Sequence, residues 1–278
     1  MTAHRIDVNA DAGESYGRWR LGEDARLFQY VSSTNIACGF HAGDPTTMHA
    51  AVRAARDAGV AVGAHPGYPD KLGFGRRAMA VSIEETTDYV VYQVGSLAAI
   101  AATEGVRLRH LKPHGALMGA VCRNPDLATA VAAAVHRAGL DLPLMLAPSP
   151  ALDAVEAAGH PVIPENAVDL GFDDDGLNII EPRPAARDPD RVAQVALAAA
   201  AGHAVTTTGR TIPMPVRSIC VHGDRPNAVD IAAAVHRRLT EAGIAVQPGD
   251  RRCVGQVTHG CIGHLSPVPG WQPRELRR

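Results

Sequence analysis

The chain alternates between two kinds of segment about seven times, and this alternation limits its fold more than any other feature of the sequence. Short apolar runs typical of buried strands are followed by longer alanine-rich stretches of helical period. The expected strands cover residues 5–9, 34–37, 60–64, 109–112, 142–147, 161–163 and 219–221. The expected helices cover residues 45–58, 83–103, 126–138, 149–158, 188–201 and 228–242, and Asp44, Ser82 and Asp188 stand where helix N-caps belong. A repeated strand-then-helix order predicts a parallel sheet with right-handed crossovers.

A parallel sheet of this kind either closes into a barrel or stays open. A length of 278 residues suits one large α/β barrel or two small domains. The chain has no Gly-x-Gly-x-x-Gly after its first expected strand and no Gly-x4-Gly-Lys-[Ser/Thr], so an open nucleotide-binding sheet lacks its main support. We therefore predict an α/β fold, an irregular (β/α) barrel of about seven parallel strands formed by residues 1–250. Residues 166–187 are expected to form a lid-like loop, and residues 251–278 a tail that is poorly ordered or packed on a neighbour.

Composition excludes several classes of partner. The formal net charge is -2 and aromatic residues make up 4% of the chain, whereas nucleic-acid binding requires a basic surface and often aromatic stacking platforms. No stretch approaches the roughly 18 to 20 apolar residues that span a bilayer, and no signal segment opens the chain. Five scattered cysteines fit a reducing compartment. We expect a cytoplasmic protein that binds neither nucleic acid nor membrane, and the sequence leaves homo-oligomerisation open.

Polar side chains gather where the expected strands end. Because the carboxyl ends of parallel strands meet on one face of a barrel, residues far apart in sequence should converge there on one pocket. Four of these residues are histidines, each with a glycine or proline within two residues, which is difficult to attribute to chance. The residues at or just after strand ends are Asp7, Asn9, Asp11, Glu14, Asn35, His41, Asp44, His65, Lys112, His114, His222 and Asp224.

Lys112 is unusual because only two of the 27 basic residues are lysines. It lies at an expected strand end beside His114, where its ammonium group could neutralise a carboxylate or a developing oxyanion. The other lysine, Lys71, is expected to be exposed. The adjacent Arg76 and Arg77 follow a glycine-rich turn, where they could bind an anion or anchor the loop.

Several familiar site motifs are absent. The last residues contain Cys253, His259, Cys261 and His264, but without a Cys-x2-Cys pair they match no compact zinc motif. The chain also lacks Gly-x-Ser-x-Gly and His-Glu-x-x-His. Standard serine-hydrolase and zincin mechanisms are therefore not supported.

Seven segments in register resemble the LamB/YcsF family. They are residues 7–14, 33–45, 63–70, 73–77, 92–95, 112–117 and 220–224. The resemblance implies a glycoside hydrolase/deacetylase-type (β/α) barrel and a part in the ATP-dependent opening of 5-oxoproline, a lactam, to glutamate. It also implies partner subunits B and C, which would contribute to ATP use because this chain has no recognisable phosphate-binding loop.

We assign hypothetical roles to the residues that carry the resemblance. Lys112 and Asn9 would hold the substrate carboxylate or an oxyanion, and histidines with one aspartate would provide acid–base catalysis. The candidate catalytic residues are Asp7, Asn9, Asp11, His41, His65, Lys112, His114 and Asp224. The candidate substrate-binding residues are Asn35, Glu165, His222, Arg76 and Arg77. A divalent metal is an open alternative, with Asp11, His41 and His65 as candidate ligands of a metal-dependent amide hydrolase or deacetylase. A non-catalytic regulatory subunit is a further alternative.

The chain departs from the family pattern at several positions, one of which is Glu181, where the family usually has arginine. Leu170 and Phe172 stand where the family usually has arginine and tyrosine, and Met118 replaces a usual tyrosine. Loss of polar partners costs about 1 to 3 kcal/mol each, which is enough to change substrate choice. The identity of the lactam therefore stays open.

Overall fold

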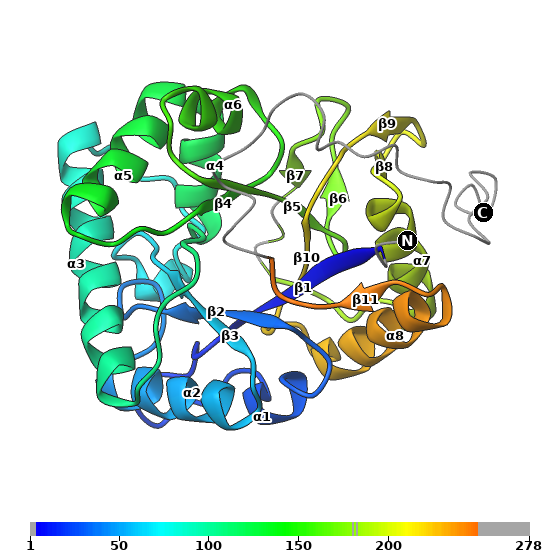
Figure 1. Ribbon diagram of the computed structural model, residues 1–278, viewed down its shortest axis with the longest axis horizontal. Coiled ribbons are helices and arrows are strands. Elements are labelled where there is room, and N and C mark those ends of the chain that lie inside the picture. Colours follow the sequence, from blue (N-terminus) through cyan, green and yellow to red (C-terminus); the bar gives the residue numbers. More distant parts are fainter. Residues whose placement is uncertain (1–3, 180, 182, 250–278) are drawn as a thin grey trace.

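Six strands of the computed structural model form one curled parallel sheet, which confirms the predicted irregular (β/α) barrel (Figure 1). The structure describes residues 4–179, 181 and 183–249. The six strands are neighbours in the order β3 (Ala61–His65), β2 (Ser33–Ala37), β1 (Arg5–Ala12), β10 (Ser218–Val221), β5 (Val162–Ala167) and β4 (Leu144–Leu146). Each lies within or next to a run that the sequence predicts as a strand.

The predicted strand at residues 109–112 closes the barrel between β3 and β4. Leu111 forms parallel bridges to Ala64 of β3 and to Leu144 of β4. On one side the Lys112 amide donates to the Ala64 carbonyl at 2.9 Å, and on the other the Met145 amide donates to the Leu111 carbonyl at 2.8 Å. This segment is therefore the seventh parallel member of the barrel wall.

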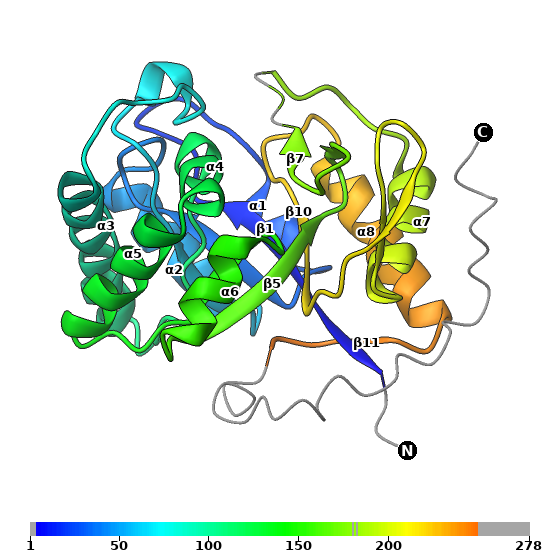
Figure 2. The ribbon, with the colours of Figure 1, turned by 90° about the horizontal axis from the view of Figure 1, so that it is seen from above.

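The predicted helices surround these strands. Figure 2 shows α7 and α8 on one side of β1 and β10, and the helices from α2 to α6 on the other. Asp44, Ser82 and Asp188 accept hydrogen bonds from amides of the first helical turns, which confirms the three predicted N-caps. The six helices are α2 (Pro45–Asp57), α3 (Ile83–Thr103), α5 (Pro125–Arg137), α6 (Pro150–Ala157), α7 (Pro189–Ala200) and α8 (Ala228–Glu241).

The sequence did not reveal several short elements. Helix α4 (Gly115–Arg123) begins directly after His114, and two glycines among its nine residues weaken its helical signal. The prediction of a loop over residues 166–187 is wrong in part, because β5 continues to Ala167 by pairing with Cys220 and a small hairpin follows. The remaining short elements are α1 (Asp24–Leu27), the 3-10 turn η1 (Lys71–Gly73), β6 (Gly171–Phe172), β7 (Asn178–Ile179), β8 (His203–Val205), β9 (Thr211–Pro213) and β11 (Ala245–Val246). The predicted tail at residues 251–278, with its cysteines and histidines, lies outside the described residues.

The inner face of the barrel wall carries polar side chains, whereas the outer face, which packs against the helices, carries apolar ones. Along β1, Val8 and Ala10 belong to the main hydrophobic core, while the alternate residues Asp7, Asn9 and Asp11 are buried and bind other polar side chains. Alternate residues of a strand point to opposite faces of the sheet, so Asp7, Asn9 and Asp11 all point into the barrel and follow one another along β1. So many buried polar groups require hydrogen-bond partners inside the barrel. The members of this network that lie at the carboxyl ends of the strands form the site described below.

Gly63 makes room for one member of that interior network. A Cβ atom at this position would lie 2.1 Å from Nε2 of the buried His110. We expect Gly63→Ala to lower the free energy of unfolding by about 1 to 3 kcal/mol, because the imidazole must leave its packed position. Denaturant unfolding measures the change. Gly95→Ala is the matched control, because no atom of the described residues outside the backbone of helix α3 lies within 4 Å of its added Cβ, and alanine favours a helix by about 1 kcal/mol. An unchanged Gly63→Ala stability would contradict this account of the interior.

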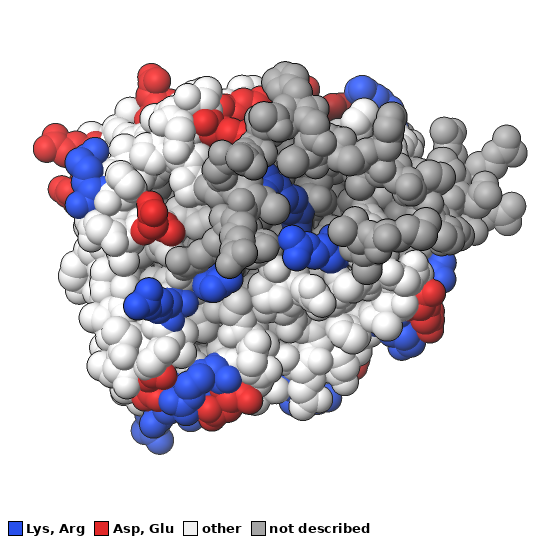
Figure 3. Space-filling view, in the orientation of Figure 1, with Lys and Arg blue, Asp and Glu red and all other residues white. Residues whose placement is uncertain are grey.

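The surface has no single charge sign on the face that Figure 3 shows. Lysine, arginine, aspartate and glutamate are interspersed among uncharged residues over the part of that face belonging to described residues. Among the described helices, none is both long and apolar enough to cross a membrane.

Candidate active site

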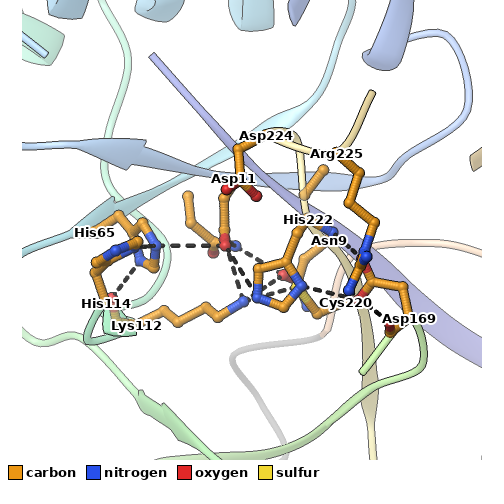
Figure 4. Close-up of polar contacts among 12 residues, drawn as sticks. Asn9, Asp11, His65, Lys112, His114, Asp169, Cys220, His222, Asp224 and Arg225 are labelled. Carbon is orange, nitrogen blue, oxygen red and sulfur yellow. Dashed lines mark hydrogen bonds and ion pairs between the residues drawn. The ribbon is translucent and has the colours of Figure 1, made fainter. Parts of the chain in front are cut away.

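A pocket opens at the carboxyl ends of the barrel strands, where the sequence predicted convergence. Its volume is about 840 Å³, which includes open solvent at the mouth. Eight of the predicted site residues line it: Asp11, His65, Arg76, Lys112, His114, Glu165, His222 and Asp224. Asp11, His65 and Glu165 lie on β1, β3 and β5. Figure 4 shows Asp11 and His65 together with Lys112, His114, His222 and Asp224, which lie in segments outside these strands.

The Lys112 ammonium group lies between two carboxylates in the pocket floor. Its Nζ atom is 3.1 Å from Asp11 Oδ1 and 2.9 Å from Glu165 Oε1, and it donates to Cys220 Sγ at 2.8 Å (Figure 4). Burial alone would lower the pKa of Lys112, but Asp11, Cys220 and Glu165 outweigh burial and raise it well above its usual range. The surroundings of Lys112 therefore favour its ammonium form.

Asp11 is held as a carboxylate by its neighbours. Burial disfavours its charge, but His65 and Lys112 outweigh this effect and hold the pKa of Asp11 well below its usual range. The Asn35 amide donates to Asp11 Oδ1 at 2.7 Å and fixes the orientation of the carboxylate. Asp11 also lies 3.4 Å from His65 Nε2 and 3.7 Å from His222 Nε2, both measured from Oδ2. It links the two halves of the site.

His222 occupies one half of the site together with Asp169. Its Nδ1 atom is 2.8 Å from Asp169 Oδ1, and Arg225 holds that carboxylate by donating from Nε to Oδ2 at 2.7 Å. Burial would lower the pKa of His222, but Asp169 and then Asp11 outweigh burial and raise it. A histidine oriented and charged by a buried carboxylate, with its other ring nitrogen toward the pocket, can transfer protons.

Three stacked or crossed histidines occupy the other half. His41 lies parallel to His114 with 3.8 Å between ring centroids, and His114 Nδ1 is 3.0 Å from His65 Nε2. Burial and then neighbouring imidazoles hold the pKa values of His41 and His114 well below their usual range. Burial, reinforced by Asp224 and Asp11, raises the pKa of the adjacent Glu14 well above its usual range.

Five predicted site residues do not line the pocket. The expectation that Asp7 and Asn9 mark the end of the first strand is wrong, because β1 continues to Ala12. Asp7 lies lower in the barrel, where it accepts hydrogen bonds from Ser32, Ser33 and Ser218. The other three are Asn35 and His41, which pack behind lining residues, and Arg77, which binds Asp70 with a side chain that is 66% exposed.

The two adjacent arginines thus separate. Arg76 lines the pocket and binds Asp224 at 2.7 Å, while Arg77 anchors its own loop. Among the departures from the family pattern, Leu170, Met118 and Glu181 line the pocket, whereas Phe172 packs in a small separate core with Ala204 and Met214.

Sequence reasoning missed several residues of the network, among them His110, Asp169, Cys220 and Arg225. His110 Nε2 donates to Asn35 Oδ1, and burial followed by Lys112 lowers the pKa of His110 to about 3, so it is neutral. Its spacing of two from Lys112 within an expected strand was a usable signal, since both must share the interior face. Arg225 gave no such signal, because its partner Asp169 is 56 residues away.

Comparisons with known proteins agree with this architecture. The model of the LamB/YcsF family matches residues 6–253. The chain is 43% identical over 249 residues to the A subunit of 5-oxoprolinase from Rhodopseudomonas palustris, covering 88% of this chain and 98% of that protein. It is 42% identical over 248 residues to the A subunit of 5-oxoprolinase from Pyrococcus horikoshii, covering 88% and 97%. The crystal structure of a lactam utilization protein from Thermus thermophilus superposes with a TM-score of 0.80 at 41% identity, covering 87% of this chain and 99% of that one.

Proposed function

Because this chain belongs to the LamB/YcsF family, we propose that it is the A-type component of an ATP-dependent 5-oxoprolinase, acting with B and C subunits to open 5-oxo-L-proline to L-glutamate. Relatives that are named as the A component of 5-oxoprolinase, and that match over nearly their whole length, support this proposal. The observation that carries it is the Lys112 ammonium, fixed by Asp11 and Glu165 in the floor of a small-molecule pocket.

The reaction needs an activated carbonyl. A five-membered lactam is a resonance-stabilised amide with a poor leaving group, so water attacks it slowly. Transfer of the γ-phosphoryl group of ATP to the lactam oxygen leaves ADP and creates an electrophilic carbon. Water then adds to that carbon, and a proton passes to the ring nitrogen as the C–N bond breaks, which leaves an acyl phosphate. A second water hydrolyses the acyl phosphate to glutamate and phosphate.

The pocket residues suit the parts of this reaction that this chain would perform. The Lys112 cation offsets negative charge that develops on the lactam oxygen. His222, oriented by Asp169, moves the proton between water and the ring nitrogen. Arg76 and Arg123 line the pocket and supply positive charge for the substrate carboxylate. ATP is used by the complex, with the phosphate-binding machinery supplied by the B and C subunits.

Reconstitution tests the proposal. We expect the purified chain alone to release almost no glutamate from 5-oxoproline, and the chain with B and C subunits to release one glutamate for each ATP hydrolysed. A coupled assay for glutamate and ADP measures both products. Robust turnover by this chain alone without ATP would contradict the proposal and favour the alternative of a metal-dependent amide hydrolase.

A different lactam is the second candidate substrate. Leu170 and Met118 give the pocket an apolar wall where the family pattern has polar side chains, which favours a lactam with an apolar substituent. The same assay with a series of substituted lactams decides between the two. A higher kcat/KM for 5-oxoproline than for every apolar analogue would exclude the second candidate.

A further inference from the structure

A cluster of buried side chains beside the pocket contains polar atoms that make no hydrogen bond within the described part of the chain. Glu14, His41, His65 and His114 each contribute one nitrogen or oxygen, and these atoms all lie within 4.8 Å of one another. All four residues are buried. We propose that these four side chains bind one divalent transition-metal ion of the Zn²⁺ class.

The hydrogen bonds of His65 and His114 fix where their lone pairs point. His65 Nδ1 is 2.7 Å from the Lys112 carbonyl oxygen, and His114 Nε2 is 2.8 Å from the Phe74 carbonyl oxygen. A carbonyl oxygen only accepts, so each of these nitrogens carries the hydrogen. In the neutral rings, His65 Nε2 and His114 Nδ1 are therefore both lone-pair acceptors, yet they face each other at 3.0 Å. Two acceptors at this distance repel each other unless a cation lies between them, and a metal ion bound to both nitrogens would satisfy both lone pairs.

Other donors in the cluster also lack partners. Glu14 Oε1 and both ring nitrogens of His41 are buried and make no hydrogen bond to any residue that the structure describes. Buried polar atoms are nearly always satisfied in folded proteins, and those left over point to an ion or ligand. Glu14 Oε1 lies 3.4 Å from His41 Nε2 and 3.7 Å from His114 Nδ1.

These separations fit a metal centre. Metal–nitrogen bonds of about 2.0 to 2.1 Å in a tetrahedral site place neighbouring ligand atoms about 3.3 Å apart. The separations of 3.0 Å between His65 Nε2 and His114 Nδ1 and of 3.7 Å between His114 Nδ1 and Glu14 Oε1 bracket that value. The parallel stack of His41 on His114 means that His41 must tilt to ligate, so His65, His114 and Glu14 are the primary ligands.

The surroundings have the form of a second coordination shell. Backbone carbonyls that accept from the distal nitrogen of metal-bound histidines fix the ring orientation, and two of the three histidines have such a bond. Glycines allow the close approach of His41: a Cβ atom at Gly67 would lie 2.6 Å from its Nδ1. Three imidazoles and one carboxylate suit zinc, iron, cobalt or nickel better than magnesium or calcium.

The competing group around Cys220 is less suited to a metal. Asp11, Cys220 and His222 also place donor atoms within 4.8 Å of one another. Lys112 Nζ, however, lies 3.1 Å from Asp11 and 2.8 Å from Cys220, and a fixed cation there opposes a second positive charge.

Metal binding to the full-length chain tests the proposal without any turnover assay, so its result is separate from the fate of the proposed function. Chelator-treated protein is titrated with ZnCl₂ by calorimetry and with CoCl₂ by visible absorption. We expect one equivalent of each metal and a cobalt spectrum typical of mixed nitrogen and oxygen ligands. Absence of stoichiometric binding of either metal to the folded chain would overturn the proposal.

Variants locate the ion. His114→Gln and the isosteric Glu14→Gln should each weaken Zn²⁺ binding by more than the roughly 10- to 100-fold that loss of an outer-shell partner costs. His136→Gln is the matched control, because His136 is exposed and contacts only Asp141 among carboxylates that the structure describes. Circular dichroism establishes whether each variant is folded. If His114→Gln does not fold, Glu14→Gln alone tests the assignment of the ligands. Unweakened binding in a folded ligand variant would place the metal elsewhere and overturn the assignment.

Discussion

Replacing Lys112 with methionine is expected to lower the kcat of the reconstituted complex by about 100- to 1,000-fold, the usual effect of removing one oxyanion donor. The same change removes the cation between Asp11 and Glu165. Breaking a buried ion pair by removing one partner costs about 3 to 5 kcal/mol of folding stability, because the remaining charge is uncompensated. Turnover and denaturant unfolding should therefore both change.

Two further variants separate the effects on catalysis and on folding. Combining Lys112→Met with Asp11→Asn and Glu165→Gln removes the uncompensated charges, so we expect stability to recover while turnover stays low. Lys71→Met is the matched control, since the only other lysine donates to the Gly39 and Gly43 carbonyls outside the pocket lining. Full turnover by the folded Lys112→Met complex would eliminate the catalytic role and favour a regulatory subunit.

His222→Gln should lower kcat/KM by about 100- to 10,000-fold, the range for loss of a positioned general acid or base. Glutamine retains a polar side chain but cannot exchange a proton near neutral pH. The steady-state assay of the reconstituted complex measures the loss. His49→Gln is the control, because His49 binds Glu104 away from the pocket lining. A His222→Gln complex with wild-type kcat/KM would remove His222 from the proposed mechanism.

The pH profile distinguishes proton transfer from simple packing. Asp169 and Asp11 stabilise the protonated ring and raise the pKa of His222. Asp169→Asn removes the carboxylate that raises the pKa of His222 more than Asp11 does, so the pKa of His222 should fall. The part of the pH profile of kcat/KM that reflects titration of His222 should then move to lower pH. The direction is the same whether His222 acts as acid or as base. If the folded Asp169→Asn variant shows the same pH dependence of kcat/KM as the unaltered complex, the kinetics do not depend on the interaction of His222 with Asp169.

The two halves of the site share Asp11. Its Oδ2 atom faces His65 on the metal-binding side and His222 on the proton-transfer side, while Oδ1 holds Lys112. Neutralising Asp11 therefore alters three neighbours at once, and effects of variants around it should not be additive.

The sequence by itself determined the strands, the principal helices and the face that carries the site. Hydrophobic periodicity and N-caps are local signals, so Asp44, Ser82 and Asp188 could be read directly as helix starts. Parallel topology then placed Asp11, His65, Lys112 and His222 at one end of the barrel, because strand direction alone decides where carboxyl ends meet.

Only the tertiary structure decided which of these residues act together. Asp7 and Asp11 look alike in sequence, yet β1 extends far enough that Asp7 binds serines deep in the barrel while Asp11 reaches the pocket. The pairing of Arg225 with Asp169 is likewise invisible along the chain. The physical reason is that a buried charge is stabilised by whichever groups surround it in three dimensions. For Lys112 those groups lie 101, 53 and 108 residues away at Asp11, Glu165 and Cys220, and no local pattern encodes such separations.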